Sequence, residues 1–106
     1  MRLTNSQKKQ VVNSLEQLKG NIYKGIALEK YIGKMFGPFD SYKKNWKLSD
    51  NIVDCSYVDD ASNNINEYYV HVEITDDTYT DILCIINNFE DDPKDWVILV
   101  KDVIRN

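Results

Sequence analysis

The sequence is poor in the residues that build metal centres. It has one histidine, His71, and two cysteines, Cys55 and Cys84, which stand far apart in the chain. Zinc sites in small domains take their Cys and His ligands in closely spaced pairs, and no C-x-x-C pair is present. We therefore expect no metal and no cofactor. Both cysteines are expected to be buried, reduced thiols on strands.

Glycine is scarce too, and this disfavours a common kind of nucleotide site. All four glycines lie within the first 37 residues. A phosphate-binding loop needs several glycines close together between a strand and a helix, so no phosphate cradle is expected. No serine or cysteine stands in a nucleophile motif beside a base either. The sequence thus predicts no catalytic residues and no enzymatic activity.

No hydrophobic run is long enough to cross a membrane. The longest runs from Trp96 to Val100, which is strand length. A spanning helix needs about 20 apolar residues. The first residues include Lys8 and Lys9 but no apolar stretch behind them, as a secretory signal would have. We expect a cytoplasmic protein without membrane contact.

The residues that are present predict a single globular domain over 1–106, because 42% are hydrophobic and 28% are charged. Its first part, 5–36, has the period of a helix, and any of the residues at 4–6 can cap the start. Apolar residues recur along one helical face, namely Val11, Leu15, Leu18 and Ile22. One long bent helix or two helices fit this segment, and Gly20-Asn21 favours two. Gly37-Pro38 ends it.

Residues 46–104 change to the period of a strand. Four segments show it: 46–58, 67–74, 79–86 and 96–100, the first beginning near Trp46 and Leu48. In 67–74 one side is apolar, with Tyr68, Val70, Val72 and Ile74. Segment 79–86 is apolar on both faces, as in a central strand. Short polar turns join the segments, so sequential strands pair as neighbours. The predicted fold is α+β, with one or two N-terminal helices packed on one face of a four-stranded antiparallel meander.

Charge is divided sharply between the two halves of the chain. Residues 1–50 hold ten Lys and Arg against four Asp and Glu, a net charge of +6. Residues 51–106 hold three Lys and Arg against thirteen Asp and Glu, a net charge of −10. A concentration of one sign attracts an oppositely charged surface and speeds encounter. The acidic half therefore predicts a protein partner with a basic surface.

Most of these acids fall in the turns between strands. In a meander the first and third connections meet at one end of the sheet, which brings together Asp59, Asp60, Glu90, Asp91 and Asp92. Asp76 and Asp77 occupy the opposite end. Asp is also a common turn former, so a solvated edge and a partner-binding edge both remain open. The loop 87–92 lacks the regular spacing of a calcium loop, which disfavours a metal site there.

A second candidate surface is the polar side of segment 67–74, where Tyr69, His71 and Glu73 line up. Such a trio can perform acid–base chemistry. It has no activated nucleophile beside it, however, and an open sheet is a flat place for catalysis. We predict that the three residues point away from the helices and contact a partner. Tyr31 and Tyr68, by contrast, are expected in the core.

The lysines of the first half raise the alternative of nucleic-acid binding. They are spread around the predicted helices rather than gathered into a stripe. The sequence pI of about 4.9 also disfavours contact with a phosphate backbone. We expect no direct nucleic-acid binding.

In size, acidity and lack of a catalytic motif the chain is similar to the small bacterial immunity proteins, which neutralise a cognate toxin by stoichiometric binding. The resemblance implies that acidic and aromatic side chains occupy the basic cleft of a nuclease-type toxin. A phage-type inhibitor is a close variant, and we expect the free protein to be a monomer. The alternative is a cystatin-like or NTF2-like α+β domain with a ligand pocket or weak enzymatic activity. A cavity lined by Trp46, Tyr57 and Trp96 is its expected mark.

Overall fold

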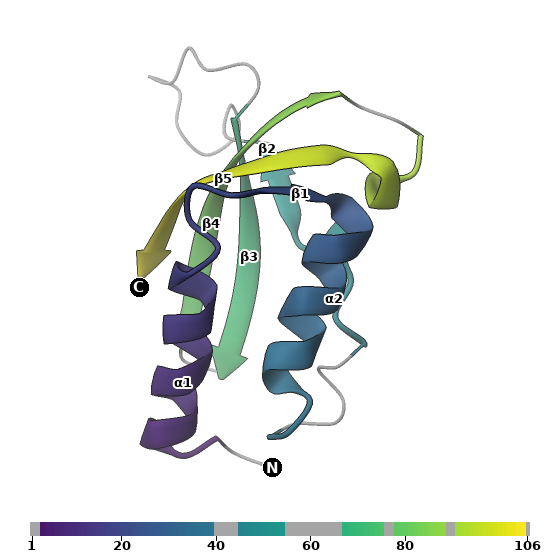
Figure 1. Cartoon of the computed structure of the whole chain (residues 1–106). Coiled ribbons are helices and arrows are strands. Elements are labelled where there is room, and N and C mark those ends of the chain that lie inside the picture. The colour runs from purple at the N-terminus through teal and green to yellow at the C-terminus, as the bar shows by residue number, and fades with distance from the viewer. Residues whose placement is uncertain (1–2, 40–44, 55–66, 76–77, 89–90, 106) are drawn as a thin grey trace.

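The computed structural model describes residues 3–39, 45–54, 67–75, 78–88 and 91–105. Within these ranges the chain forms two α-helices and a five-stranded antiparallel sheet, which confirms the predicted α+β class. Both helices lie on the same side of the sheet (Figure 1). Neither of these helices has the length and apolar character that a membrane crossing requires.

The elements in chain order are α1 (Asn5–Glu16), β1 (Ile22–Lys24), α2 (Gly25–Phe36), the 3-10 helix η2 (Leu48–Asp50), β2 (Ile52–Asp54), β3 (Glu67–Thr75), β4 (Thr78–Asn88), the 3-10 helix η4 (Pro93–Asp95) and β5 (Val97–Arg105). The strand order is β1-β5-β4-β3-β2. Strands β2 to β5 are therefore a meander, as predicted. β4 is the central strand, and β5 continues through Val103 and Ile104.

Helix α1 starts at the first of the predicted caps. The Thr4 hydroxyl accepts the backbone N–H of Gln7 at 3.2 Å, and the Gln7 side-chain oxygen accepts the backbone N–H of Thr4 at 2.9 Å. This reciprocal pair satisfies two donors that have no partner inside the helix. Val11 and Leu15 are buried, so the predicted apolar face is confirmed along this helix.

A fifth strand interrupts the region that was predicted to be helical. α1 ends at Glu16, and Gly20 turns the chain with a φ of +85°, a conformation that favours glycine. The Gly20 N–H donates to the Val100 carbonyl at 2.8 Å, and Ile22 then pairs with Leu99. The prediction of four strands was wrong for this reason, and Ile22 is 67% exposed instead of lying on a buried helix face.

Two further predictions are corrected near α2. The segment near Trp46 and Leu48 does not begin a strand; Leu48–Asp50 is a 3-10 helix. The Glu29 carboxylate on α2 accepts the Leu48 N–H at 3.1 Å, which ties this turn to the helix in place of a strand partner. Tyr31 is 52% exposed rather than in the core, because Leu28 and Ile32 take the buried positions of α2.

The hydrophobic core lies between the helices and one face of the sheet. On β3, Val70, Val72 and Ile74 are buried, which confirms the predicted alternation, and Tyr68 packs partly buried against them. The other core residues are Leu3, Val11, Leu15, Leu18, Leu28, Ile32, Phe36, Leu48, Ile82, Cys84, Ile86, Ile98 and Val100. Cys84 is a free thiol as predicted, whereas Cys55 lies outside the described residues.

Beyond its short pairing with β1, the strand β5 carries a charged edge. The Asp102 carboxylate accepts the backbone N–H of Val103 at 2.8 Å and lies 3.2 Å from the ammonium of Lys19 on the turn after α1. These two contacts, the hydrogen bond from Val103 first, hold the pKa of Asp102 below its usual value. A register shift near Leu83 and Cys84 also bends this part of the sheet. Charged and bulged edges resist pairing with a strand of another molecule.

Candidate functional site

The face of the sheet opposite the core carries no helix of the described ranges (Figure 1). We call it the open face. The strand register places on it Val53, Glu67, Tyr69, His71, Glu73, Tyr79, Asp81, Leu83, Ile85 and Leu99. Large side chains are exposed there, with Val53 at 41% and Tyr79 at 39%. The face thus combines apolar and aromatic surface with acidic groups.

His71 and Asp81 form the best-defined contact on the open face. They stand directly opposite each other on β3 and β4, and His71 Nδ1 lies 2.9 Å from Asp81 Oδ1. The backbone N–H of His71 donates to the Asn51 carbonyl on the other side of β3. The His71–Asp81 pair is therefore a non-hydrogen-bonded pair of the β3–β4 ladder, in which opposing side chains come closest. Since an ionised carboxylate only accepts, His71 Nδ1–H donates and Nε2 is left for another contact.

Tyr79 and Glu73 complete a cluster around this pair. Tyr79 stands opposite Glu73, and its ring centroid lies 4.6 Å from that of His71. Two carboxylates and two rings therefore belong to two successive cross-strand pairs on the same face of the sheet. Carboxylates attract a cationic side chain, and the tyrosine ring presents a face that attracts it as well. We call Glu73, His71, Tyr79 and Asp81 the acidic-aromatic cluster.

An ion pair crosses the sheet toward the other end of the open face. Lys101 Nζ on β5 lies 2.7 Å from Glu67 Oε1 on β3. Glu67 is only 9% exposed, although its place in the strand predicted a wet side chain. Its hydrogen bond and its charge raise the pKa of Lys101. The two charges of this pair neutralise each other, whereas Glu73 and Asp81 of the acidic-aromatic cluster lie toward the other end of β3.

Three of the predicted partner-binding residues, Tyr69, His71 and Glu73, lie together on β3 and face away from the helices. Asp91 is exposed, and Asp92 caps η4, where its carboxylate accepts the Lys94 N–H at 3.0 Å. Asp92 therefore has the local role that the solvated-turn alternative expects. The other predicted residues lie outside the described ranges, namely Asp59, Asp60, Asp76, Asp77 and Glu90. The meeting of the acidic turns at one end of the sheet stays a prediction.

The sequence reasoning missed Tyr79 and Asp81. Segment 79–86 was interpreted by its apolar character, so its polar and aromatic members were not assigned to a face. The signal was available in the short connection between Thr75 and Thr78. Residues equally distant from such a turn lie opposite each other, which pairs residue 71 with 81 and residue 73 with 79. Applying this register to the predicted hairpin would have found the cluster.

The open face offers few groups for nucleophilic catalysis. The strands given above carry no serine, and Cys84 on β4 is buried in the core. His71 is thus oriented by a carboxylate, but no serine or exposed cysteine of the described strands stands beside it. Among the described residues no three His, Cys, Asp or Glu side chains gather as a possible metal site. Part of the loop 87–92, weighed as a calcium loop, lies outside the described residues.

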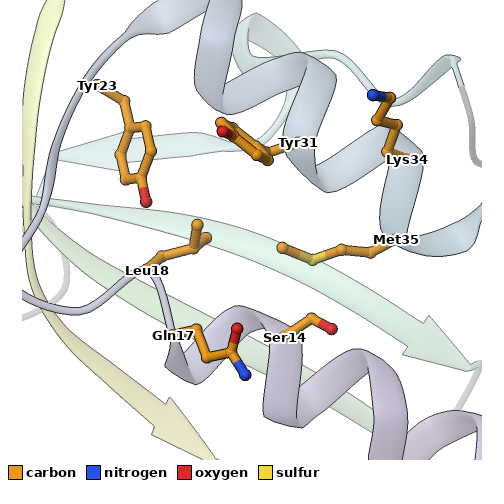
Figure 2. A pocket seen from close by; sticks show the side chains of 7 residues that line it. All are labelled: Ser14, Gln17, Leu18, Tyr23, Tyr31, Lys34 and Met35. Atoms are coloured by element: carbon orange, nitrogen blue, oxygen red, sulfur yellow. The ribbon is translucent and has the colours of Figure 1, made fainter.

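A cleft of about 370 Å³ opens on the other side of the molecule, between α1, α2 and β1 (Figure 2). Its described lining consists of Ser14, Gln17, Leu18, Tyr23, Tyr31, Lys34 and Met35. None of these residues was predicted as part of a site. The signal for it was weak, because the cleft depends on where β1 separates the two helices.

Trp46 and Trp96, which the ligand-pocket alternative places around a cavity, pack partly buried against the core. Neither belongs to the lining of the cleft between the helices. Tyr57 lies outside the described residues, so this alternative stays a prediction. No protein family, no curated protein and no solved structure matches the chain.

Proposed function

We propose that this chain is a small inhibitor protein that neutralises a basic protein by stoichiometric binding through the open face. The class that fits best is that of bacterial toxin-immunity proteins acting on a nuclease-type toxin in the cytoplasm, with a phage-type inhibitor as a close variant. The observation that carries the proposal is the acidic-aromatic cluster, set within an apolar sheet face that no described helix covers.

The composition of the open face favours a protein partner. Protein interfaces have an apolar and aromatic centre, and their strongest contributions come from a few Tyr, Trp and Arg residues. Tyr69 and Tyr79 supply rigid rings, and Val53, Leu83 and Leu99 supply apolar area along neighbouring strands. A flat surface of this kind suits a folded partner better than a small molecule, which needs a concave site.

The charge of the acidic half supports a basic partner. The thirteen acids against three bases after residue 50 give a field that steers a basic surface toward the sheet. In the proposed complex the acidic-aromatic cluster pairs with lysines or arginines that otherwise hold nucleic acid. The inhibitor thereby excludes the substrate of the toxin and catalyses no reaction itself.

The experiment takes as candidate partner any nuclease that is encoded by a gene adjacent to this one. Calorimetric titration should give one-to-one binding, and nuclease activity should fall in proportion to the inhibitor added. Tyr79→Ala and Glu73→Lys should each weaken binding tenfold or more, as expected for central interface residues. Tyr31→Ala is the matched control, since it removes an exposed tyrosine from the helical side. If the control variant weakens binding as much as Tyr79→Ala, the open face is not the interface.

A second candidate function, weak hydrolytic activity, has one observation in its favour. The His71–Asp81 hydrogen bond is the arrangement that orients a histidine as a general base. His71→Ala separates the two proposals. Loss of a hydrolytic activity with unchanged partner binding would replace inhibition by catalysis, whereas weaker partner binding with no activity in either protein supports inhibition.

A further inference from the structure

The cleft between the helices is independent of the open face. It lies on the helical side of the sheet, where α1 contributes Ser14, β1 contributes Tyr23, and α2 contributes Tyr31 and Met35 (Figure 2). Its volume of about 370 Å³ is in the range of small-ligand sites, which is roughly 300–1,000 Å³. We propose that this cleft binds a small planar aromatic molecule that carries an anionic group. The site goes beyond the proposed inhibitory function and does not depend on it.

The walls of the cleft fit an aromatic ring. The rings of Tyr23 and Tyr31 meet edge to face, with centroids 5.6 Å apart and an interplanar angle of 67°. Leu18 and Met35 lie below them in Figure 2, one from each side of the cleft. Because the two tyrosine rings already contact each other, a flat ligand ring packs against the pair from the side of Leu18 and Met35, where it also contacts the thioether of Met35. Tyr31 is about half exposed, so part of its side chain is open to a ligand.

Tyr23 is held in position at the cleft. The Asn21 side-chain amide donates to the Tyr23 hydroxyl at 3.2 Å and to the Gln17 carbonyl at 3.1 Å. The amide thus links the end of α1 to β1 and fixes the tyrosine before a ligand arrives. Fixed rings lose little conformational freedom on binding, which favours affinity. The Tyr23 hydroxyl can donate its own proton to a ligand oxygen.

The charge around the cleft selects an anion. Lys34 is the only charged residue in the described lining, and no acid is among the lining residues. The Lys34 side chain lies at the rim with its ammonium turned away from the cleft (Figure 2), and its flexible stem allows other rotamers that bring the charge closer to a bound anion. Lys34 also borders a neighbouring hollow together with Lys30. This side of the molecule is formed by the half of the chain with a net charge of +6.

The test titrates the full chain, labelled with ¹⁵N, with naphthalene-2-carboxylate and follows the amide shifts. We expect a Kd on the order of 1 mM, as the ligand efficiency of small molecules implies. Shifts should be confined to the residues around Ser14–Leu18, Tyr23 and Tyr31–Met35. Naphthalene-2-carboxamide lacks the charge and cyclohexanecarboxylate lacks the aromatic ring, so both should bind at least roughly threefold more weakly.

Variants assign the binding to particular side chains. Tyr31→Ala should weaken binding of the carboxylate roughly fivefold, and Lys34→Gln roughly threefold. Tyr79→Ala, on the open face, should leave the Kd unchanged. Equal binding of the carboxylate and the carboxamide, no loss in Tyr31→Ala, or shifts centred on the open face would each overturn the proposal. None of these results depends on whether a protein partner exists.

Discussion

Gly25 is the residue whose size the fold restricts most clearly. Its N–H donates to the Trp96 carbonyl at 2.8 Å, and a Cβ atom at this position would overlap the carbonyl oxygen of Pro93. Gly25→Ala therefore has to separate η4 from the start of α2. We expect the free energy of unfolding to fall by about 1–3 kcal/mol, as for other overpacked sites. Urea denaturation followed by tryptophan fluorescence measures the change.

Gly37→Ala is the matched control for this prediction. Its Cβ would have the Lys34 carbonyl oxygen as nearest atom at 3.5 Å, an ordinary contact, and its φ of −49° suits any residue. The free energy of unfolding should change by less than about 0.5 kcal/mol. Equal losses in the two variants would show that helix geometry, and not contact with Pro93, makes alanine costly at residue 25.

His71 and Val72 are neighbours on β3 that face opposite sides of the sheet, so they test the face assignment directly. His71 is partly exposed, and water can replace its hydrogen bond to Asp81. His71→Ala should therefore lower the free energy of unfolding by about 1 kcal/mol or less. Val72 is completely buried, and Val72→Ala should lower it by about 2 kcal/mol because a cavity remains. The reverse order in chemical denaturation would mean that His71 is a core residue.

At the scale of elements, patterns within one segment predicted the structural features that depend on residues close together in the sequence. The alternation in 67–74 identified β3 and its buried side correctly, because burial on one face of a strand recurs at every second residue. The residues at 11, 15, 18 and 22 fit a helix equally well, yet only the first three belong to the helix and the turn that follows it. Residue 22 is placed by β5, nearly 80 residues later, where it pairs with Leu99. Periodicity within one segment holds no information on such a partner.

The same reasoning explains what was found of the site. Tyr69, His71 and Glu73 belong to one strand and were predicted together. Asp81 and Tyr79 needed the register between two strands, which the alternation of either strand alone does not give. The helical cleft needed the position of β1, and it was missed entirely.

The edge of β5 gives a prediction about pH at this scale. The contacts from Val103 and Lys19 lower the pKa of Asp102 in the folded state. A lowered folded-state pKa adds stability above the unfolded value, near 3.8, and this stability is lost as the pH falls through the folded-state pKa. Asp102→Asn keeps an acceptor for the Val103 N–H but removes the charge. It should lower the urea midpoint at pH 7, and the difference from the wild type should shrink below the unfolded value.

Lys19→Gln serves as the second arm of that experiment. If the charge pair carries part of the effect, the double variant should lose less stability than the sum of the two single losses. Asp102→Asn should then matter less when Lys19 is absent. A difference between wild type and Asp102→Asn that persists at pH 2 would contradict the assignment of the effect to ionised Asp102.

On the scale of the whole molecule, the basic half of the sequence supplies both described α-helices, and the acidic half supplies four of the five described strands. The helices come first in the chain and carry exposed lysines, including Lys9, Lys30 and Lys34, whereas the strands β2 to β5 that follow hold five acids against two bases. The order of elements therefore converts a difference in charge along the chain into a difference in charge between the helical side and the sheet. Among the described strands of the sheet, only β1 comes from the basic half of the chain. Under the proposed function, the acidic layer meets the partner first.

This layering predicts how fast the proposed complex forms. Reversal of three exposed acids of the sheet half, as Glu73→Lys, Asp91→Lys and Asp95→Lys combined, should slow association with the basic partner by about tenfold or more at low salt, because steering depends on the summed charge. Asp92 is left unchanged, since its carboxylate caps η4. Stopped-flow fluorescence measures the rate, and circular dichroism checks that the fold is retained. The effect should shrink in about 0.5 M salt, where charges are screened beyond a few ångströms.

A variant with the opposite change of charge separates steering from net charge and from local contacts. Lys9→Glu, Lys30→Glu and Lys47→Glu combined reverse three exposed lysines of the helical side. If attraction to the acidic layer limits the rate, this variant should associate as fast as the wild type or faster, because it adds negative charge without touching the open face. An association rate that is unchanged in the acid-reversed variant would rule out steering by the sheet half. A rate that falls in the lysine-reversed variant would instead place part of the interface on the helices.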